Sequence, residues 1–179
     1  EVHGSLAQHR LISRLVHDPR FAGAVDDVVV EFGNARYQSV VDRYIRGDPM
    51  PWASVRRAWT RTTQQTGVWN SPVYPAFFRT IRDVNRRLRQ GQRIRVVLAD
   101  PPIDWSKIDQ ARCGNPTLDW KQPYCLDYWY HRRESHAAKV IRREVLARGR
   151  TALLIAGNTH FRRTRAPLPD DADPGLITL

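Results

Sequence analysis

The sequence predicts an α/β fold, in which a parallel sheet carries helices on both faces. Three short apolar runs, at residues 27–32, 93–99 and 151–156, have the length and the aliphatic composition of buried strands. Segments with helical periodicity separate each run from the next, and they are long enough for the crossover connections that parallel strands require. Strands that alternate with helices in this way favour a single parallel sheet.

The helices on either side of the first strand are defined by the residues at their ends. Ser5, followed three residues later by Gln8, matches a capping box and begins a helix that stops before Pro19. Between residues 37 and 45, apolar side chains recur at positions i, i+3, i+4, i+7 and i+8, and Gly47 ends this second helix. Both segments therefore have one apolar face to pack on the sheet.

Three further helices complete the crossovers. Pro51 can occupy the first position of one helix, and residues 74–88 form another with a strongly apolar face. The stretch 101–125 contains proline and aspartate without a repeating period, which is typical of a loop insertion that covers a site. Residues 127–148 then predict a helix that ends before Gly149.

The length and composition are those of one globular domain. The chain has 179 residues, and we expect one α/β domain over residues 1–166 and an irregular tail over residues 167–179. No apolar run approaches the roughly 20 residues of a membrane-spanning helix. We expect a soluble protein, with a cytoplasmic location slightly favoured over export. Cys113 and Cys125 lack the spacing of a zinc site, and either a disulfide or two free thiols would fit.

The formal net charge of +11 raises the question of nucleic-acid binding. Arginine supplies nearly all of the positive charge, and it is spread over the polar faces of the predicted helices rather than interleaved with aromatic residues. We therefore expect a solvated basic surface, with a nucleic-acid site or the steering of anionic lipids or substrates as the alternatives. The expected partner is a small-molecule substrate, and the sequence does not predict an oligomeric state.

Two histidines and one carboxylate fall where strands meet loops. Glu31 lies inside the apolar run 28–32, where a charge is costly unless it is paired or lies at the strand end. His3 lies in a loop-like segment that leads into the first helix, and His160 follows the third strand in Gly157-Asn158-Thr159-His160. Because parallel strands gather their carboxyl ends at one edge, we expect these side chains to share a site for water activation or metal binding.

These motifs resemble the Tiki superfamily, which contains erythromycin esterases, Tiki-type metalloproteases, TraB-like proteins and ChaN-like haem-binding proteins. That superfamily has two Gly-x-x-His motifs, a glutamate in the strand after the first motif, and an arginine. Here Gly157 to His160 gives the complete second motif, Glu31 matches the strand glutamate, and Glu1-Val2-His3 matches the last three positions of the first. Because such a first motif normally follows a strand, we expect the sheet of this chain to lack its first strand.

Three shorter segments resemble the esterase branch. They are Val41-Asp42-Arg43-Tyr44, Arg82-Asp83-Val84-Asn85, and Arg133-Glu134-Ser135-His136-Ala137, in which His136 replaces the usual methionine. The resemblance and the strand ends together give four candidates for substrate binding, namely Asn34, Asp100, Arg133 and Asn158. The alternatives are turn residues for the two asparagines and Asp100, and a solvent-facing side chain for Arg133.

Three functions follow from these residues, and an esterase-like hydrolase is favoured. In this reaction His3 and His160 are catalytic, and a neutral histidine, with a pKa of about 6.5, activates water to cleave an ester or lactone. Glu31 orients that histidine or takes a proton from it. No cofactor is expected for that reaction. The second function is a metal-dependent hydrolase or protease, with His3, Glu31 and His160 as ligands of a divalent ion. The third, implied by the ChaN-like branch, is a non-catalytic haem or iron binder.

Overall fold

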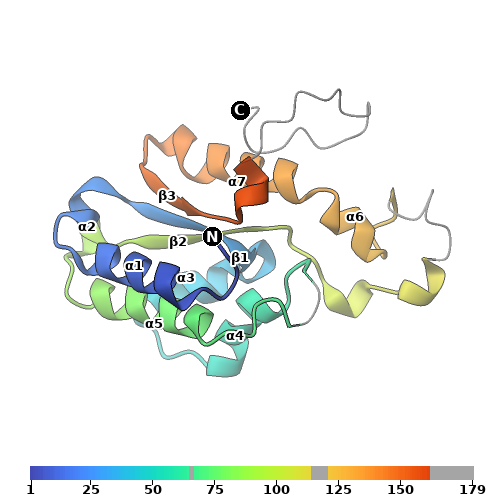
Figure 1. The fold of residues 1–179 in the computed structure, drawn as a ribbon, viewed down its shortest axis with the longest axis horizontal. Coiled ribbons are helices and arrows are strands. Elements are labelled where there is room, and N and C mark those ends of the chain that lie inside the picture. Colours follow the sequence, from blue (N-terminus) through green and yellow to red (C-terminus); the bar gives the residue numbers. More distant parts are fainter. Residues whose placement is uncertain (65–66, 114–120, 162–179) are drawn as a thin grey trace.

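The computed structural model describes residues 1–64, 67–113 and 121–161, and it confirms the α/β fold (Figure 1). The sheet contains β1 (Asp27–Asn34), β2 (Arg95–Asp100) and β3 (Ala152–Ile155). The strand order is β2-β1-β3, and both pairings are parallel. In the register, Val28 of β1 lies opposite Val96 of β2 and Leu153 of β3. The carboxyl ends of all three strands therefore meet at one edge, as predicted.

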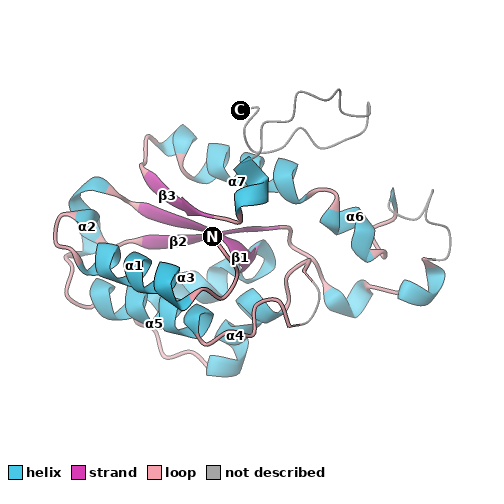
Figure 2. Cartoon of the chain, in the orientation of Figure 1, coloured by secondary structure: helices cyan, strands magenta, loops and turns pink. Residues whose placement is uncertain are grey.

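Helices cover both faces of the sheet (Figure 2). Helices α1 (Leu6–His17), α3 (Gln38–Arg46), α4 (Trp52–Thr60) and α5 (Val73–Asn85) pack on one face, and α7 (Arg133–Glu144) packs on the other. Two short helices, α2 (Phe21–Ala24) and α6 (Leu126–Tyr130), lie in the connections. Ser5 caps α1 through its side chain, and Gly47 ends α3 with a φ of 113°, as the sequence predicted. Within the described ranges, no helix has the length and apolarity to cross a membrane.

The two faces of the sheet have different cores. The face under α1, α3, α4 and α5 is rich in aromatic side chains, among them Phe32, Trp59, Trp69, Tyr74, Phe77 and Phe78. The face under α7 is smaller and aliphatic, with Val29, Val97, Ala99, Ala137, Val140 and Val145. Because alternate residues of a strand point to opposite faces, Glu31 shares with Val29 the side that α7 covers.

Several elements differ from their predicted bounds: β2 is at 95–100 instead of 93–99, β3 is at 152–155 instead of 151–156, and α5 ends at 85 instead of 88. The helix expected at residues 127–148 is divided into α6 and α7 by a turn at His131 and Arg132, and α7 ends at Glu144. The first strand continues two residues beyond residue 32, because glycine at position 33 allows a close strand approach. A Cβ at Gly33 would lie 2.5 Å from the Leu98 Cδ2 atom of β2.

The loop insertion contains a disulfide between Cys113 and Cys125. The sequence left a disulfide and two free thiols open, and the structure has the disulfide. The described part of the insertion has only short 3-10 turns, at Trp105–Lys107 and Gln110–Arg112. Residues 114–120 lie outside the described residues, and so does the predicted tail at 167–179.

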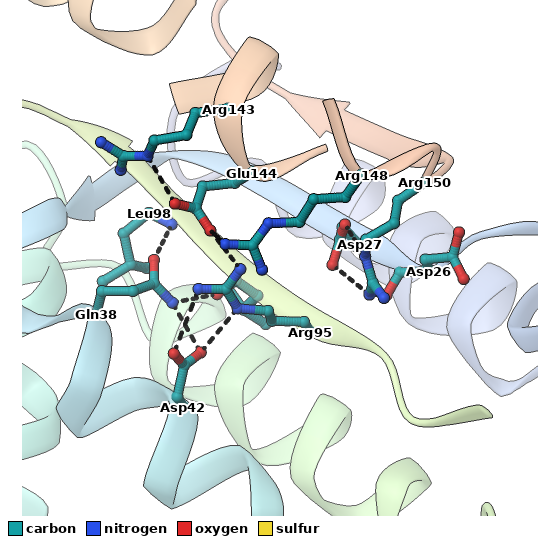
Figure 3. Close-up of polar contacts among 11 residues, drawn as sticks. Asp26, Asp27, Gln38, Asp42, Arg95, Leu98, Arg143, Glu144, Arg148 and Arg150 are labelled. Atoms are coloured by element: carbon teal, nitrogen blue, oxygen red, sulfur yellow. Dashed lines mark hydrogen bonds and ion pairs between the residues drawn. The ribbon is translucent and has the colours of Figure 1, made fainter. Parts of the chain in front are cut away.

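An ion-pair network holds the opposite end of the sheet together (Figure 3). The Arg95 guanidinium of β2 binds Asp42 of α3 at 3.2 Å and Glu144 of α7 at 2.9 Å, so it joins helices from both faces. Beside it, Arg150 pairs with Asp27 at the start of β1 at 2.7 Å. The candidate site lies at the other edge of the sheet, where the strands end.

Candidate active site

Glu31 is the centre of a buried polar cluster at the carboxyl edge of the sheet. Its side chain is 7% exposed, and its Oε1 atom lies 2.7 Å from Arg133 and 2.9 Å from the Nε2 atom of His160. The backbone N–H of Gly157 donates to Oε2 at 2.6 Å. The predicted partners Glu31 and His160 therefore meet directly, because β1 and the segment after β3 end side by side. Their catalytic role stays a prediction.

Glu31 and His160 are both charged in the folded protein. Burial raises the pKa of the Glu31 carboxyl, but the hydrogen bond and charge of His160, the Gly157 N–H and the Arg133 charge outweigh burial and lower this pKa to about 2. The carboxylates of Glu134 and Glu31 raise the pKa of His160 to about 9, against the opposing effect of burial. His160 is consequently an imidazolium at pH 7, and not the neutral histidine that the sequence led us to expect.

Glu134 is a site residue that the sequence analysis did not select. It lies in the first turn of α7, and its Oε1 atom hydrogen-bonds the Nδ1 atom of His160. Its Oε2 atom is buried and has no hydrogen-bond partner among the described residues. His160 is thus held between two carboxylates from different elements, one from β1 and one from α7. The sequence feature that could have identified Glu134 is its place beside Arg133 in the segment that resembles the esterase branch.

Arg133 links Glu31 to a second carboxyl group. Its Nε atom lies 3.3 Å from Asp100, which also accepts hydrogen bonds from the backbone N–H of Thr63 at 2.7 Å and the Thr63 hydroxyl at 2.5 Å. Burial raises the pKa of Asp100 to about 6, against the lowering effect of Arg133 and Thr63. Arg133 and Asp100, both predicted to bind substrate, are buried and engaged within the protein. Arg133 does not face solvent, which was its alternative interpretation.

His3 approaches the same edge from the N-terminal loop. A Cβ on Gly157 would lie 3.4 Å from the Cε1 atom of His3 and 3.5 Å from the Cδ2 atom of His160, so both rings flank this glycine. The His3 side chain is 37% exposed, and its Nδ1 atom is 3.5 Å from Glu1. The Trp69 ring packs edge-on against it, with 4.4 Å between ring centroids. His3 is therefore the more accessible of the two histidines.

Glu1 is the second residue that the sequence analysis did not place in the site. Its side chain is 3% exposed and lies 2.8 Å from the Nε2 atom of His9. The Tyr74 hydroxyl donates to Glu1 at 3.3 Å and accepts from the Gly4 N–H at 2.8 Å. These contacts fix the loop that carries His3, and α1 and α5 supply the groups that do so.

A small cavity adjoins the cluster. Its volume of about 20 Å³ is enough for about one water molecule. Its accessible lining is mainly apolar, and the polar and charged residues contribute little of it. The lining residues are Ala99, Ala137, Leu154 and Ala156, together with Glu31, Asp100, Arg133, Glu134 and His160. Larger side chains at the alanine positions would fill this space. The cavity therefore has room for about one water molecule, and Glu134 is one of the residues that line it.

The two asparagines predicted to bind substrate lie in different surroundings. Asn34 is fully buried; its amide donates to the backbone carbonyls of Arg61 and Ile103, and its oxygen accepts from the Arg36 N–H at 2.8 Å. Asn158 is exposed in the 3-10 turn Asn158–Phe161 that carries His160. Asn158 thus remains accessible to a ligand, whereas Asn34 joins three segments of the protein.

The alternative metal ligands do not form a coordination shell. Within the described ranges, no three His, Cys, Asp or Glu side chains gather in an arrangement that could hold a metal ion. Both nitrogens of His160 face carboxylates, and both oxygens of Glu31 accept hydrogen bonds from protein groups. The residues named for the metal alternative therefore do not fit that role in this arrangement.

The fold and the site together define an α/β protein with a buried carboxylate–imidazolium–carboxylate cluster at the strand ends. Comparisons with known protein families, curated proteins and solved structures find no match. The resemblance to the Tiki superfamily accordingly remains an expectation from the sequence motifs.

Proposed function

We propose that this protein is an esterase-like hydrolase that uses Glu134, held by His160 and Glu31, to activate water. The observation that carries the proposal is the buried, unpartnered Oε2 atom of Glu134 in a residue that lines a water-sized cavity. A buried carboxylate oxygen without a partner is costly, so such an atom is a good candidate for binding and deprotonating a water molecule. The esterase-like motif order gives additional support.

The charges of the cluster assign the roles. Water bound at Glu134 attacks the carbonyl carbon of the ester and passes its proton to the carboxylate. When the C–O bond of the tetrahedral intermediate breaks, that proton returns to the leaving alkoxide. The His160 imidazolium orients Glu134 and stabilises developing negative charge, and Glu31 keeps His160 charged. His3, at the accessible edge, is placed to contact the substrate. In this scheme a carboxylate activates the water and a histidine orients that carboxylate, whereas the sequence predicted that a histidine activates the water. The difference arises because the pKa of His160 is raised to about 9.

The substrate class in this proposal is a small ester or lactone. The site lies at the strand ends, where open α/β sheets bind small ligands. The disulfide between Cys113 and Cys125 favours an oxidising compartment, because such bonds persist outside the reducing cytoplasm. We therefore include export in the proposal, in place of the cytoplasmic location that the sequence slightly favoured.

Hydrolysis of p-nitrophenyl esters and simple lactones tests the proposal. We expect Glu134→Gln and His160→Ala each to lower kcat/KM by about 10²-fold or more, as for loss of a general base or its support. Asp127→Asn, which removes an exposed carboxylate from neighbouring α6, is the control and should retain activity. If the Glu134 variant hydrolyses the esters at the rate of the unmodified protein, the assignment of the base is wrong.

The same assay separates the two alternatives. In the proposed reaction, EDTA leaves the activity intact, whereas a metal-dependent hydrolase would lose activity with EDTA and regain it with a divalent ion. A haem binder would hydrolyse none of these substrates and would develop a Soret band on titration with haemin. Absence of hydrolysis with every ester, lactone and peptide offered would remove the hydrolase proposal.

A further inference from the structure

A second hollow, of about 500 Å³, opens at the end of α4 and shares no lining residue with the cavity beside Glu31. Three arginines line it, Arg36, Arg57 and Arg61, together with Tyr37 and Trp105. Its volume is within the range of about 300–1,000 Å³ that is usual for small-molecule sites. Neither the motifs nor the proposed hydrolase accounts for this combination of residues.

The Asn34 side chain joins the segments that line this hollow. Its side chain begins the 3-10 turn Ala35–Tyr37 by accepting from the Arg36 N–H, and its amide donates to the backbone carbonyls of Arg61 and Ile103. The Trp105 indole N–H also donates to the Thr62 carbonyl at 3.1 Å. One buried amide therefore joins the turn after β1, the end of α4 and the loop after β2. The three segments that carry the lining side chains are fixed before any ligand binds.

The hollow has an excess of positive charge. Arg36 pairs with Asp104 at 2.9 Å, and Asp104 is itself hydrogen-bonded to Ser106 at 2.7 Å. Arg57 and Arg61 are exposed, and neither guanidinium has an ion pair within the part of the chain that the structure describes. Arg57 lies in the last turn of α4, and Arg61 is the residue that follows this helix. Three arginines and one aspartate leave two positive charges uncompensated.

We propose that this hollow binds a small organic phosphate whose phosphoryl group is attached to an aromatic ring. A phosphate monoester carries about −1.5 to −2 charges at pH 7, which matches the two uncompensated arginines. Guanidinium groups bind phosphate oxygens in a planar, bidentate geometry, and this explains the use of arginine. The rings of Tyr37 and Trp105 provide flat surfaces on which an aromatic group stacks. The site requires no catalysis and does not depend on the proposed hydrolase.

Isothermal titration calorimetry with phenyl phosphate, on the full chain, tests the proposal. We expect saturable binding of phenyl phosphate, weaker binding of inorganic phosphate, and none of benzyl alcohol. The double substitution Arg57→Gln and Arg61→Gln should weaken the binding of phenyl phosphate by about tenfold or more, because charge-assisted hydrogen bonds are lost. Trp105→Leu should weaken the binding of phenyl phosphate and leave inorganic phosphate unchanged.

A charge-matched control separates a built site from general attraction to a basic protein. Arg56→Gln combined with Arg89→Gln removes the same charge from two exposed arginines that do not line the hollow. This control should bind phenyl phosphate as the unmodified protein does. The proposal is overturned if phenyl phosphate does not bind, or if the control weakens binding as much as the substitutions at Arg57 and Arg61.

Discussion

Alkaline pH should destabilise this protein through His160. The pKa of His160 is raised from 6.5 to about 9 by Glu134 and Glu31, so the folded state holds a proton that the unfolded chain releases near pH 6.5. The resulting stabilisation is fully present below pH 6.5 and is lost as the pH rises through 9. From the pKa difference, about 3 kcal/mol of unfolding free energy should disappear between pH 6 and pH 9.

Urea unfolding, followed by far-UV circular dichroism at pH 6, 7, 8 and 9, measures this loss. The comparison is with His160→Gln, which keeps a polar side chain but cannot titrate, and whose unfolding free energy should change much less over the same range. His17→Gln, at an exposed position in the last turn of α1, is the control and should show the full loss. Equal pH dependence of the unmodified protein and His160→Gln would refute the proposed carboxylate–imidazolium contacts.

Three other perturbations follow from the structure. Ala137→Leu should fill the water-sized cavity and abolish ester hydrolysis while costing about 1–3 kcal/mol of stability, measured by urea unfolding; retained activity would exclude a catalytic water there. Replacing Cys113 and Cys125 by serine should cost about 3 kcal/mol, because the disulfide spans 12 positions, and an unchanged urea midpoint would show that the thiols are free. Arg95→Met should cost about 2 kcal/mol by removing the ion pairs that join Asp42 of α3 and Glu144 of α7 to β2, and a change below about 0.5 kcal/mol would contradict the network.

The strands and most helices were predictable because their signals are local. Apolar runs, the Ser5 cap and Gly47 act within a few residues of where they stand, and the structure has the three strands and the helix ends at Ser5 and Gly47. The meeting of Glu31 and His160 was predictable for a topological reason, since parallel strands place their carboxyl ends together. The division of the helix expected at 127–148 was not predictable, because no proline or glycine marks the turn.

The missed site residues have partners that are distant in the sequence. Glu134 reaches His160 only because α7 lies across the end of β1, and a helical period alone does not show which turn of α7 lies there. The raised pKa of His160 was missed for the same reason, since it depends on two carboxylates 26 and 129 residues away. Asn34 was selected for substrate binding from its place at a strand end, whereas its hydrogen bonds to Arg61 and Ile103 depend on tertiary contacts.

The unequal cores on the two faces of the sheet have a consequence for local opening. Helix α7 rests on small aliphatic side chains, so its amide protons should exchange with solvent through partial openings that leave the aromatic face closed. The contacts of Glu134 and Arg133 fasten the first turn of α7 to the strand ends, and those of Glu144 fasten its last turn to β2. As the pH rises, amide exchange in α7 should therefore accelerate more than the base catalysis of exchange accounts for. Exchange in α5 should accelerate only as much as base catalysis predicts.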